Sequence, residues 1–294
     1  MDGISNSRLF ITVIFDVFTL DSMRKTAVRT IIAGLYFYLI EFLEANYLVI
    51  DFQVPTYIFY LLGYVLVMLL YFKVGSSYYR WYEGRKYWSY LGTHGKNLAN
   101  KMNTILPKED KENRKWFCKM ITNHAYSLRG DLRGTDPLED VYEIEPGFRE
   151  SLKKTDDIPN HITSIMAAKL NTMYTTKQIA KYQYLNLNKY VNEIVEINEQ
   201  CRGIREIPTP ASYTQHLRIF LTMFTLCLPF GFIHDHDFIM TFVMMVIYGA
   251  YEGCIVVSEE IEQPFGTDKY DIPLDDICYS LKKHTHQLLQ VEYK

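Results

Sequence analysis

Three short clusters hold the side chains best suited to chemistry: residues 80–88 (RWYEGRKYW), 234–237 (HDHD) and 259–276 (EEIEQPFGTDKYDIPLDD). Imidazole and carboxylate groups bind transition metals, carboxylate oxygens bind calcium, and guanidinium groups pair with carboxylates and stack on aromatic rings. The sequence contains no G-x-S-x-G, no phosphate-binding glycine loop and no H-E-x-x-H. The motifs of serine hydrolases, nucleotide-binding proteins and zinc proteases are therefore missing from the sequence.

The His234–Asp237 cluster is the nearest approach to a transition-metal site. Its four residues are adjacent in a short polar connection between two apolar segments. Adjacent polar side chains on such a loop are more often hydrated than gathered around one ion. We therefore expect a hydrated loop without a metal.

The carboxylate-rich cluster at 259–276 offers oxygen ligands for calcium, with Pro264 and Gly266 shaping its turns. It lacks the spacing of a helix–loop–helix calcium hand, and Lys269 lies among its acids. We expect a hydrated acidic loop, or one that covers neighbouring helices.

The cluster at 80–88 combines two arginines, a glutamate and four large aromatic residues. Arg80 and Glu83 have the three-residue spacing of a helical ion pair, and arginine stacks favourably on tryptophan and tyrosine. The composition favours a structural contact between subunits over direct ligand contact. The residues expected to form this contact are Arg80, Trp81, Glu83, Arg85 and Trp88.

The 80–88 cluster follows the strongest apolar segment of the chain, and we expect both to lie on one helix. Val54–Phe72 contains no charged residue. At 1.5 Å per residue it is roughly 28 Å long, close to the hydrocarbon thickness of a bilayer. Three shorter apolar segments accompany it: Thr30–Ile40, Ile219–Ile233 and Phe238–Tyr251. Short spans are tolerated where neighbouring helices shield their charged ends, so we predict four membrane spans.

The overall composition agrees with a membrane protein that has a large polar part. The chain has 294 residues, a formal net charge of −3 and a mean hydropathy of −0.10. This charge excludes a nucleic-acid-binding basic surface. Five scattered cysteines without a C-x-x-C pair indicate neither a disulfide framework nor a thiolate zinc site.

The distribution of lysine and arginine predicts the orientation of the chain. The connections between the first two and the last two apolar segments contain neither residue. By the positive-inside rule, both termini and the middle region are expected in the cytoplasm, with the chain in the inner (plasma) membrane.

The middle region has helical periodicity and no alternation typical of strands, so the sequence predicts an all-α fold. Apolar residues of Lys177–Cys201 recur at three- and four-residue spacings, and Pro208 and Pro210 are expected to end this helix. The predicted divisions are 1–25 (N-terminal cytoplasmic segment), 26–74 (first two spans), 75–215 (cytoplasmic helical region), 216–256 (last two spans) and 257–294 (acidic loop and C-terminal segment).

Two motifs resemble those of bacterial bestrophin-type channels. They are R-W-x-E-G-R-x-x-W from Arg80 to Trp88 and E-x-P-F-G-x-D…D-I-P-L-D from Glu262 to Asp275, joined by a similar segment from Cys201 to Thr214. The order of the four spans also agrees, so the resemblance covers nearly the whole chain. It implies a homopentamer in a lipid bilayer with one ion path along the five-fold axis. It also implies structural roles for Pro264, Phe265 and Gly266.

The resemblance implies a hydrophobic neck from the second span and a second constriction in the cytoplasmic region. The neck falls on Tyr64, Met68 and Phe72, and the second constriction on or near Leu185. Periodicity alone does not choose this stripe, because Leu61, Val65 and Leu69 form another. A ring of apolar side chains excludes water and acts as a gate, and the positive edge of an aromatic ring such as Phe72 favours anions. We therefore expect conduction of chloride or other monovalent anions.

In animal members of that family the acidic loop holds an activating calcium ion. The corresponding positions here are Glu260, Gln263, Asp268 and Asp271, and Lys269 replaces one acid. A lysine at short range weakens cation binding. We therefore expect no tight calcium site and no cofactor.

Three alternatives remain open from the sequence. They are a monovalent-cation (sodium) channel of the same fold, a non-conducting membrane scaffold, and a membrane enzyme with a metal held by Glu252, Glu259 and Glu260. The apolar segments supply few further ligands, which disfavours the enzyme.

Overall fold

A computed structural model describes residues 21–47, 55–232 and 238–291. All regular structure in these residues is helical, without a strand, as expected from the sequence. The chain divides into two compact units, one formed by residues 1–79 with 208–262 and the other by 80–207 with 263–294. Each unit has its own apolar core.

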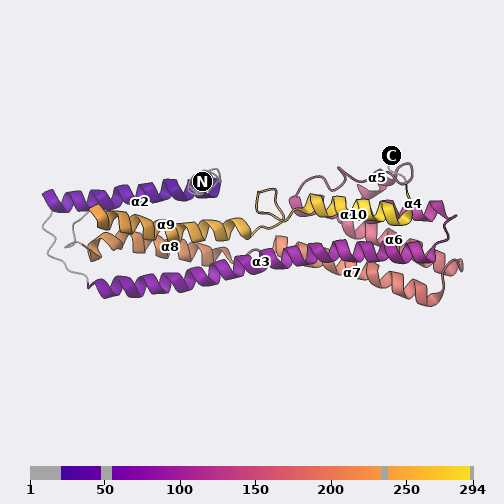
Figure 1. The fold of residues 1–294 in the computed structure, drawn as a ribbon, viewed down its shortest axis with the longest axis horizontal. Helices are drawn as coiled ribbons and strands as arrows, with labels where there is room; N and C mark the ends of the chain where they lie inside the picture. The colour runs from indigo at the N-terminus through magenta and orange to yellow at the C-terminus, as the bar shows by residue number, and fades with distance from the viewer. Residues whose placement is uncertain (1–20, 48–54, 233–237, 292–294) are drawn as a thin grey trace, which may run out of the picture. The chain divides into compact units, whose positions relative to one another are not determined.

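The first unit contains α2 (Asp21–Asn46), the start of α3 (Thr56–Ile105), α8 (Ala211–Cys227), η1 (Leu228–Gly231) and α9 (Phe238–Ile261). Helices α2 and α9 pack side by side, although almost 200 residues separate them in the chain (Figure 1). Its core includes residues from all of these elements, among them Phe37, Leu66, Leu221, Leu228 and Ile255.

Three helices of the described chain are long and apolar enough to cross a membrane, by length and composition: Ser22–Asn46, Thr56–Ile105 and Ile239–Ile261. The segment predicted as a further span, Ile219–Ile233, coincides in part with α8 and η1. Helix α8 begins earlier, at Ala211. After Cys227 the α-helix gives way to the 3-10 helix η1. Pro229 lies in the first turn of η1, where its missing N–H removes an α-helical hydrogen bond.

The second unit contains the rest of α3 with α4 (Lys111–Arg133), α5 (Phe148–Leu152), α6 (Ile158–Thr175), α7 (Lys181–Glu206) and α10 (Leu274–Leu289). Helix α4 packs against α6, α7 and α10, and α6 packs along α7. Helices α4 and α6 begin alike, because the carboxylates of Asp110 and Asp157 each accept the backbone N–H of the asparagine three residues later, at 3.1 Å in both helices.

The start of α7 differs from the expected helix over Lys177–Cys201. Lys177 has a φ of 62°, which is left-handed backbone that cannot continue a helix. The N–H groups of Gln178 and Ile179 bond back to the carbonyl of Met173, so a turn follows α6 and α7 begins only at Lys181. The helix ends at Glu206, just before Pro208, as the prolines predict.

Candidate functional site

The first half of α3 has one packed face and one open face. Phe59, Leu66 and Leu70 are buried at spacings that keep them on one side of the helix. Because each residue turns the helix by about 100°, Met68 lies about 180° away from Leu66 and Leu70.

The three predicted neck residues lie on this open face. Tyr64, Met68 and Phe72 are 64%, 46% and 60% exposed in the single chain. They recur every four residues and so form one outward stripe of large apolar side chains.

The alternative stripe of Leu61, Val65 and Leu69 is partly covered. Leu69 packs against the core, and its carbonyl accepts a 2.7 Å hydrogen bond from the Tyr213 hydroxyl of α8. This stripe is therefore covered at Leu69, whereas Leu61 and Val65 are 63% and 38% exposed.

Charged side chains join α2, α8 and α9 within the first unit. Arg29 of α2 donates to the carboxylate of Glu252, and Arg218 of α8 lies 3.5 Å from the same carboxylate. Arg218 also makes a two-point contact with Glu259, at 2.6 and 3.0 Å. Because Glu252 is buried, the positive charges of these arginines compensate its charge.

These contacts bear on the metal-enzyme alternative. Two of its three proposed carboxylate ligands, Glu252 and Glu259, are already held by arginines. Within the described residues there is no group of three or more His, Cys, Asp or Glu side chains arranged to hold a metal ion. The His234–Asp237 cluster lies outside the described residues.

A buried lysine, which is not among the residues predicted from the sequence, directly follows the stripe of Tyr64, Met68 and Phe72. The side chain of Lys73 is fully buried, and its Nζ donates to Glu262 at 2.6 Å and to the Thr209 hydroxyl at 3.1 Å. Glu262 also accepts the Thr209 backbone N–H at 2.9 Å. Lys73, Arg29 and Arg218 are isolated charges at the ends of apolar segments. A charge in such a position needs a partner, so these contacts could have been predicted from the sequence.

The cluster at 80–88 packs against its own chain in the second unit. Trp88 is fully buried, and the Trp81 indole N–H donates to the carbonyl of Tyr270 at 3.2 Å. A Cβ on Gly84 would lie 3.1 Å from Phe265 and 3.2 Å from Pro264, so glycine allows this close approach.

The charged residues of the cluster have separate partners. Arg80 donates to the carbonyls of Ile204 and Ile207 near the end of α7. Glu83 accepts from Lys86 at 3.0 Å, and the exposed Arg85 lies over the Trp81 ring at 5.6 Å.

The four residues of the possible cation loop fall in different units. Glu260 belongs to the first unit, whereas Gln263, Asp268 and Asp271 belong to the second. Asp271 accepts the backbone N–H of Asp268 at 2.7 Å, and its carboxylate lies where a side chain on Gly266 would collide with it. The Asp271 carboxylate therefore shapes the turn of its own loop.

Leu185, the predicted second constriction, is 56% exposed on α7. The buried face of this helix carries Leu187, Val191 and Ile194. Leu185 lies about 160° from Leu187 around the helix, so it points away from the packed side.

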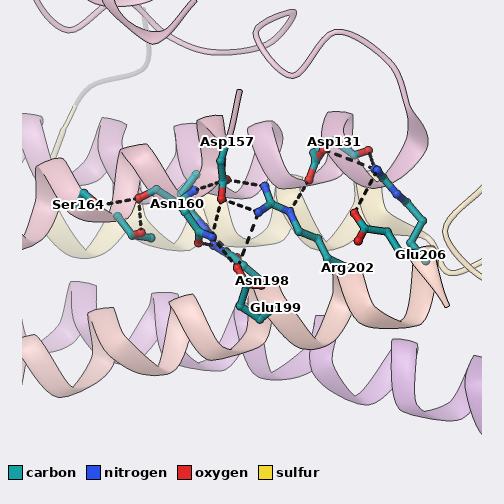
Figure 2. Close-up of polar contacts among 11 residues, drawn as sticks. Asp131, Asp157, Asn160, Ser164, Asn198, Glu199, Arg202 and Glu206 are labelled. Atoms are coloured by element: carbon teal, nitrogen blue, oxygen red, sulfur yellow. Dashed lines mark hydrogen bonds and ion pairs between the residues drawn. The ribbon is translucent and has the colours of Figure 1, made fainter. Parts of the chain in front are cut away.

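An arginine near the end of α7, which is not among the residues predicted from the sequence, joins α7 to the other helices of the second unit. Arg202 forms two hydrogen bonds to Asp157, at 2.5 and 2.6 Å, and one to Asp131 at 2.8 Å (Figure 2). The hydrogen bonds that Arg202 donates to Asp157 raise the pKa of Arg202 above its usual value. Burial tends to raise the pKa of Asp157, but the bonds from Arg202 and Asn160 outweigh it and lower the pKa.

A buried histidine extends this network. His124 Nε2 lies 3.0 Å from Asn198 Oδ1, and Asn198 in turn donates to Asn160 at 2.8 Å. Burial, helped by the charge of Arg202, lowers the pKa of His124 to about 4. His124 is therefore neutral at physiological pH and serves the packing of α4 on α7.

The chain matches a protein-family model and several described relatives. A family model described as Bacterial/Fungal Bestrophin protein matches residues 6–287. A voltage-dependent anion channel-forming protein from Nostoc is 28% identical over 230 residues, which cover 76% of this chain and 74% of that protein. The Escherichia coli protein of the same description is 27% identical over 225 residues, covering 76% of this chain and 73% of that protein.

Solved structures share the fold. A bacterial bestrophin homologue from Klebsiella pneumoniae superposes with a TM-score of 0.85 at 21% identity, covering 91% of this chain and 99% of that one. A single-substitution variant of it gives a TM-score of 0.84 at 23% identity, with 90% and 98% covered.

Proposed function

This chain belongs to the Bacterial/Fungal Bestrophin family, and we propose that it is a membrane ion channel conducting chloride and other monovalent anions. The channel is a homopentamer whose ion path runs along the five-fold axis. It lies in the inner membrane with both termini in the cytoplasm. The descriptions of the Nostoc and Escherichia coli relatives as anion channel-forming proteins support the choice of anions.

The open face of α3 is the observation that carries this proposal. A single chain exposes large apolar side chains there, on the side opposite its packed face. Apolar patches of this kind are covered by lipid or by another protein surface. Five copies arranged with this face inward would enclose a narrow apolar pore, which excludes water and acts as a gate.

Tyr64, Met68 and Phe72 form the neck in this arrangement. All three are exposed, whereas Leu69 of the other stripe packs against the core, and this difference supports the register of Tyr64, Met68 and Phe72. The edge of the Phe72 ring carries partial positive charge and favours a passing anion over a cation. Leu185, exposed on α7, forms the second constriction.

The cluster at 80–88 and the loop that follows α9 have a structural role. Trp88, Pro264 and Phe265 fill the core of their own unit. The more exposed Arg85 and Tyr82 are available to a neighbouring subunit. The full structural set is Arg80, Trp81, Glu83, Arg85, Trp88, Pro264, Phe265 and Gly266.

The protein acts without catalysis and without a tight calcium site. The arginines on Glu252 and Glu259 compensate the charges that a metal centre would need. The Asp271 carboxylate is engaged in its own loop, and Lys269 adds positive charge nearby. Adding or chelating calcium is therefore expected to leave the current unchanged.

The reversal potential of purified protein in planar lipid bilayers tests the proposal. Under a sodium chloride gradient it should lie near the chloride equilibrium potential, and replacing chloride by a large impermeant anion should abolish the anion current. A reversal potential near that of sodium would instead indicate the cation channel. Absence of current from well-folded protein would indicate the scaffold.

A further inference from the structure

A cavity in the second unit lies between the start of α4 and the end of α10. Its volume is about 560 Å³, within the range of small-molecule sites. None of the described residues that line it is an aspartate or a glutamate. Its basic residues are Lys108, Lys111, Arg114, Lys115, Lys119 and Lys282, and His286 lies beside them.

Helical spacing brings these cations together. Lys111, Lys115 and Lys119 follow one another every four residues on α4, and Lys282 and His286 have the same spacing on α10. Like charges four residues apart destabilise a helix. Three like charges on α4 that meet Lys282 of α10 around one cavity therefore suggest a bound group of opposite charge.

Arg114 adds a buried positive charge to the wall of the cavity. It is only 3% exposed, and its guanidinium donates to the carbonyls of Asn103, Leu106 and Pro107 at 2.8 to 3.1 Å. It also donates to the side-chain oxygen of Asn103 at 2.8 Å. All these acceptors are neutral, and Arg114 makes no ion pair with another described residue. The carbonyls of Asn103 and Leu106 lie at the C-terminal end of α3, so Arg114 caps that helix while its charge adds to that of the cavity.

Two lysines of the cavity donate to neutral oxygens. Lys119 Nζ donates to the carbonyl of Glu143 at 2.5 Å, and Lys282 donates to the Tyr142 hydroxyl and lies 4.9 Å from the centre of that ring. Burial lowers the pKa of Lys119, and the charge of Lys115 lowers it further, although Glu143 opposes this. The described residues that line the cavity therefore carry a net positive charge.

We propose that this cavity binds a small anion carrying two or more adjacent phosphate groups. Lysine ammonium groups bind phosphate oxygens as point charges, and several of them in one cavity match several negative charges better than one. The positive end of the α4 dipole adds to the attraction. The phosphates come either from a free polyphosphorylated molecule or from a phosphorylated lipid headgroup.

Isothermal titration calorimetry of the full chain in uncharged detergent tests the site, with inorganic tripolyphosphate as the probe. We expect one tripolyphosphate per chain at low salt, with affinity falling as salt rises. The double variant Lys111→Gln with Lys115→Gln should bind at least about tenfold more weakly, because it loses two charged contacts. The matched pair Lys154→Gln with Lys181→Gln removes the same charge at exposed positions of the second unit and should leave the affinity within about twofold.

Two further variants separate charge from folding. Lys111→Arg with Lys115→Arg should retain binding, and the glutamine pair should melt no earlier than the parent without ligand, because it removes repulsion. No binding of tripolyphosphate at low salt, or equal weakening by the control pair, would overturn the proposal.

A second arm distinguishes the source of the phosphates. Vesicles containing a phosphatidylinositol bisphosphate should compete with tripolyphosphate if the natural ligand is a headgroup, and vesicles should not compete if it is a free molecule. Either result supports the site only when tripolyphosphate binding is lost in the double variant Lys111→Gln with Lys115→Gln. Binding is measured without ion flux, so failure of the channel proposal would leave this test intact.

Discussion

On α3, the direction in which a side chain points decides its burial more than its residue type does. Met68 and Leu66 are both large and apolar, yet Leu66 is fully buried and Met68 is half exposed. The proposed roles follow from this difference, with Leu66 stabilising the fold and Met68 narrowing the pore.

Replacing Met68 with alanine should widen the neck and raise the anion current, because a shorter side chain lowers the barrier to wetting. Single-channel recording measures this directly. Val67→Ala, one residue along the same helix and turned by about 100°, is the control and should leave the conductance unchanged. Unchanged conductance in Met68→Ala would show that another stripe lines the pore.

His124 should make stability depend on pH. Burial holds its folded-state pKa at about 4, below the 6.5 of free imidazole. As the pH falls from 6.5 to 4, the unfolded chain gains the proton first, so the folded state loses up to roughly 3 kcal/mol. Melting temperatures at pH 7.5 and 5.0 measure this loss.

The variant His124→Gln should show a smaller drop in melting temperature over the same pH interval, and the control His161→Gln should keep the drop of the parent. A residual drop is expected, since burial also lowers the pKa of His286. If His124→Gln keeps the full pH dependence, His124 is not its source.

At the level of helices, α4 and α6 allow a matched comparison of their N-terminal caps. Asp110 and Asp157 accept the same bonds from Asn113 and Asn160, but only Asp157 also binds Arg202. The cap and the bond to α7 can therefore be separated.

Asp110→Ala should cost about 1 kcal/mol of unfolding free energy, the usual value of a cap. Asp157→Ala should cost about 1 kcal/mol more, because a partly exposed ion pair is lost with the cap. Denaturant unfolding in detergent measures both. In an Arg202→Gln background the two costs should become equal, and a persistent difference would argue against the Arg202 bond.

Two helical glycines should respond in opposite directions to alanine. A Cβ on Gly130 of α4 would lie 2.8 Å from the backbone of Pro137, whereas nothing lies within 4 Å of a Cβ on Gly203 of α7. Gly130→Ala should lower the melting temperature because the backbone must move, and Gly203→Ala should stabilise the protein by about 0.5–1 kcal/mol. A tolerated Gly130→Ala would mean that the turn after α4 can shift freely.

For the whole molecule, the decisive property is the number of chains that enclose the pore. Native mass spectrometry from detergent should give a particle of five chains of 34.7 kDa each, about 174 kDa in total. A monomer or dimer that still conducts would contradict the pentameric pore.

Much of the architecture was predictable from the sequence, because its causes are local. The charge-free segment before Phe72 predicted a long apolar helix, and the prolines at 208 and 210 correctly predicted the break before α8. The start of α7 was wrong by four residues, because apolar spacing continues through the turn at Lys177. A left-handed residue leaves little trace in such a pattern.

The candidate site was predictable only in part. Spacing identified Tyr64, Met68 and Phe72 as one stripe but offered the stripe of Leu69 equally. The choice depends on which side of α3 packs against the core and α8, and that is a contact between segments far apart in the chain.

The amino-acid sequence alone determined the all-helical class, the apolar spans and the family, because hydrophobic period and short motifs are properties of neighbouring residues. The tertiary structure alone decided which faces are open and which charges meet. Arg29 reaches Glu252 across 223 residues, and the lysines of α4 meet Lys282 of α10 around one cavity. Such contacts depend on how the helices pack, because a charged side chain is buried and paired only when segments distant in the sequence come together.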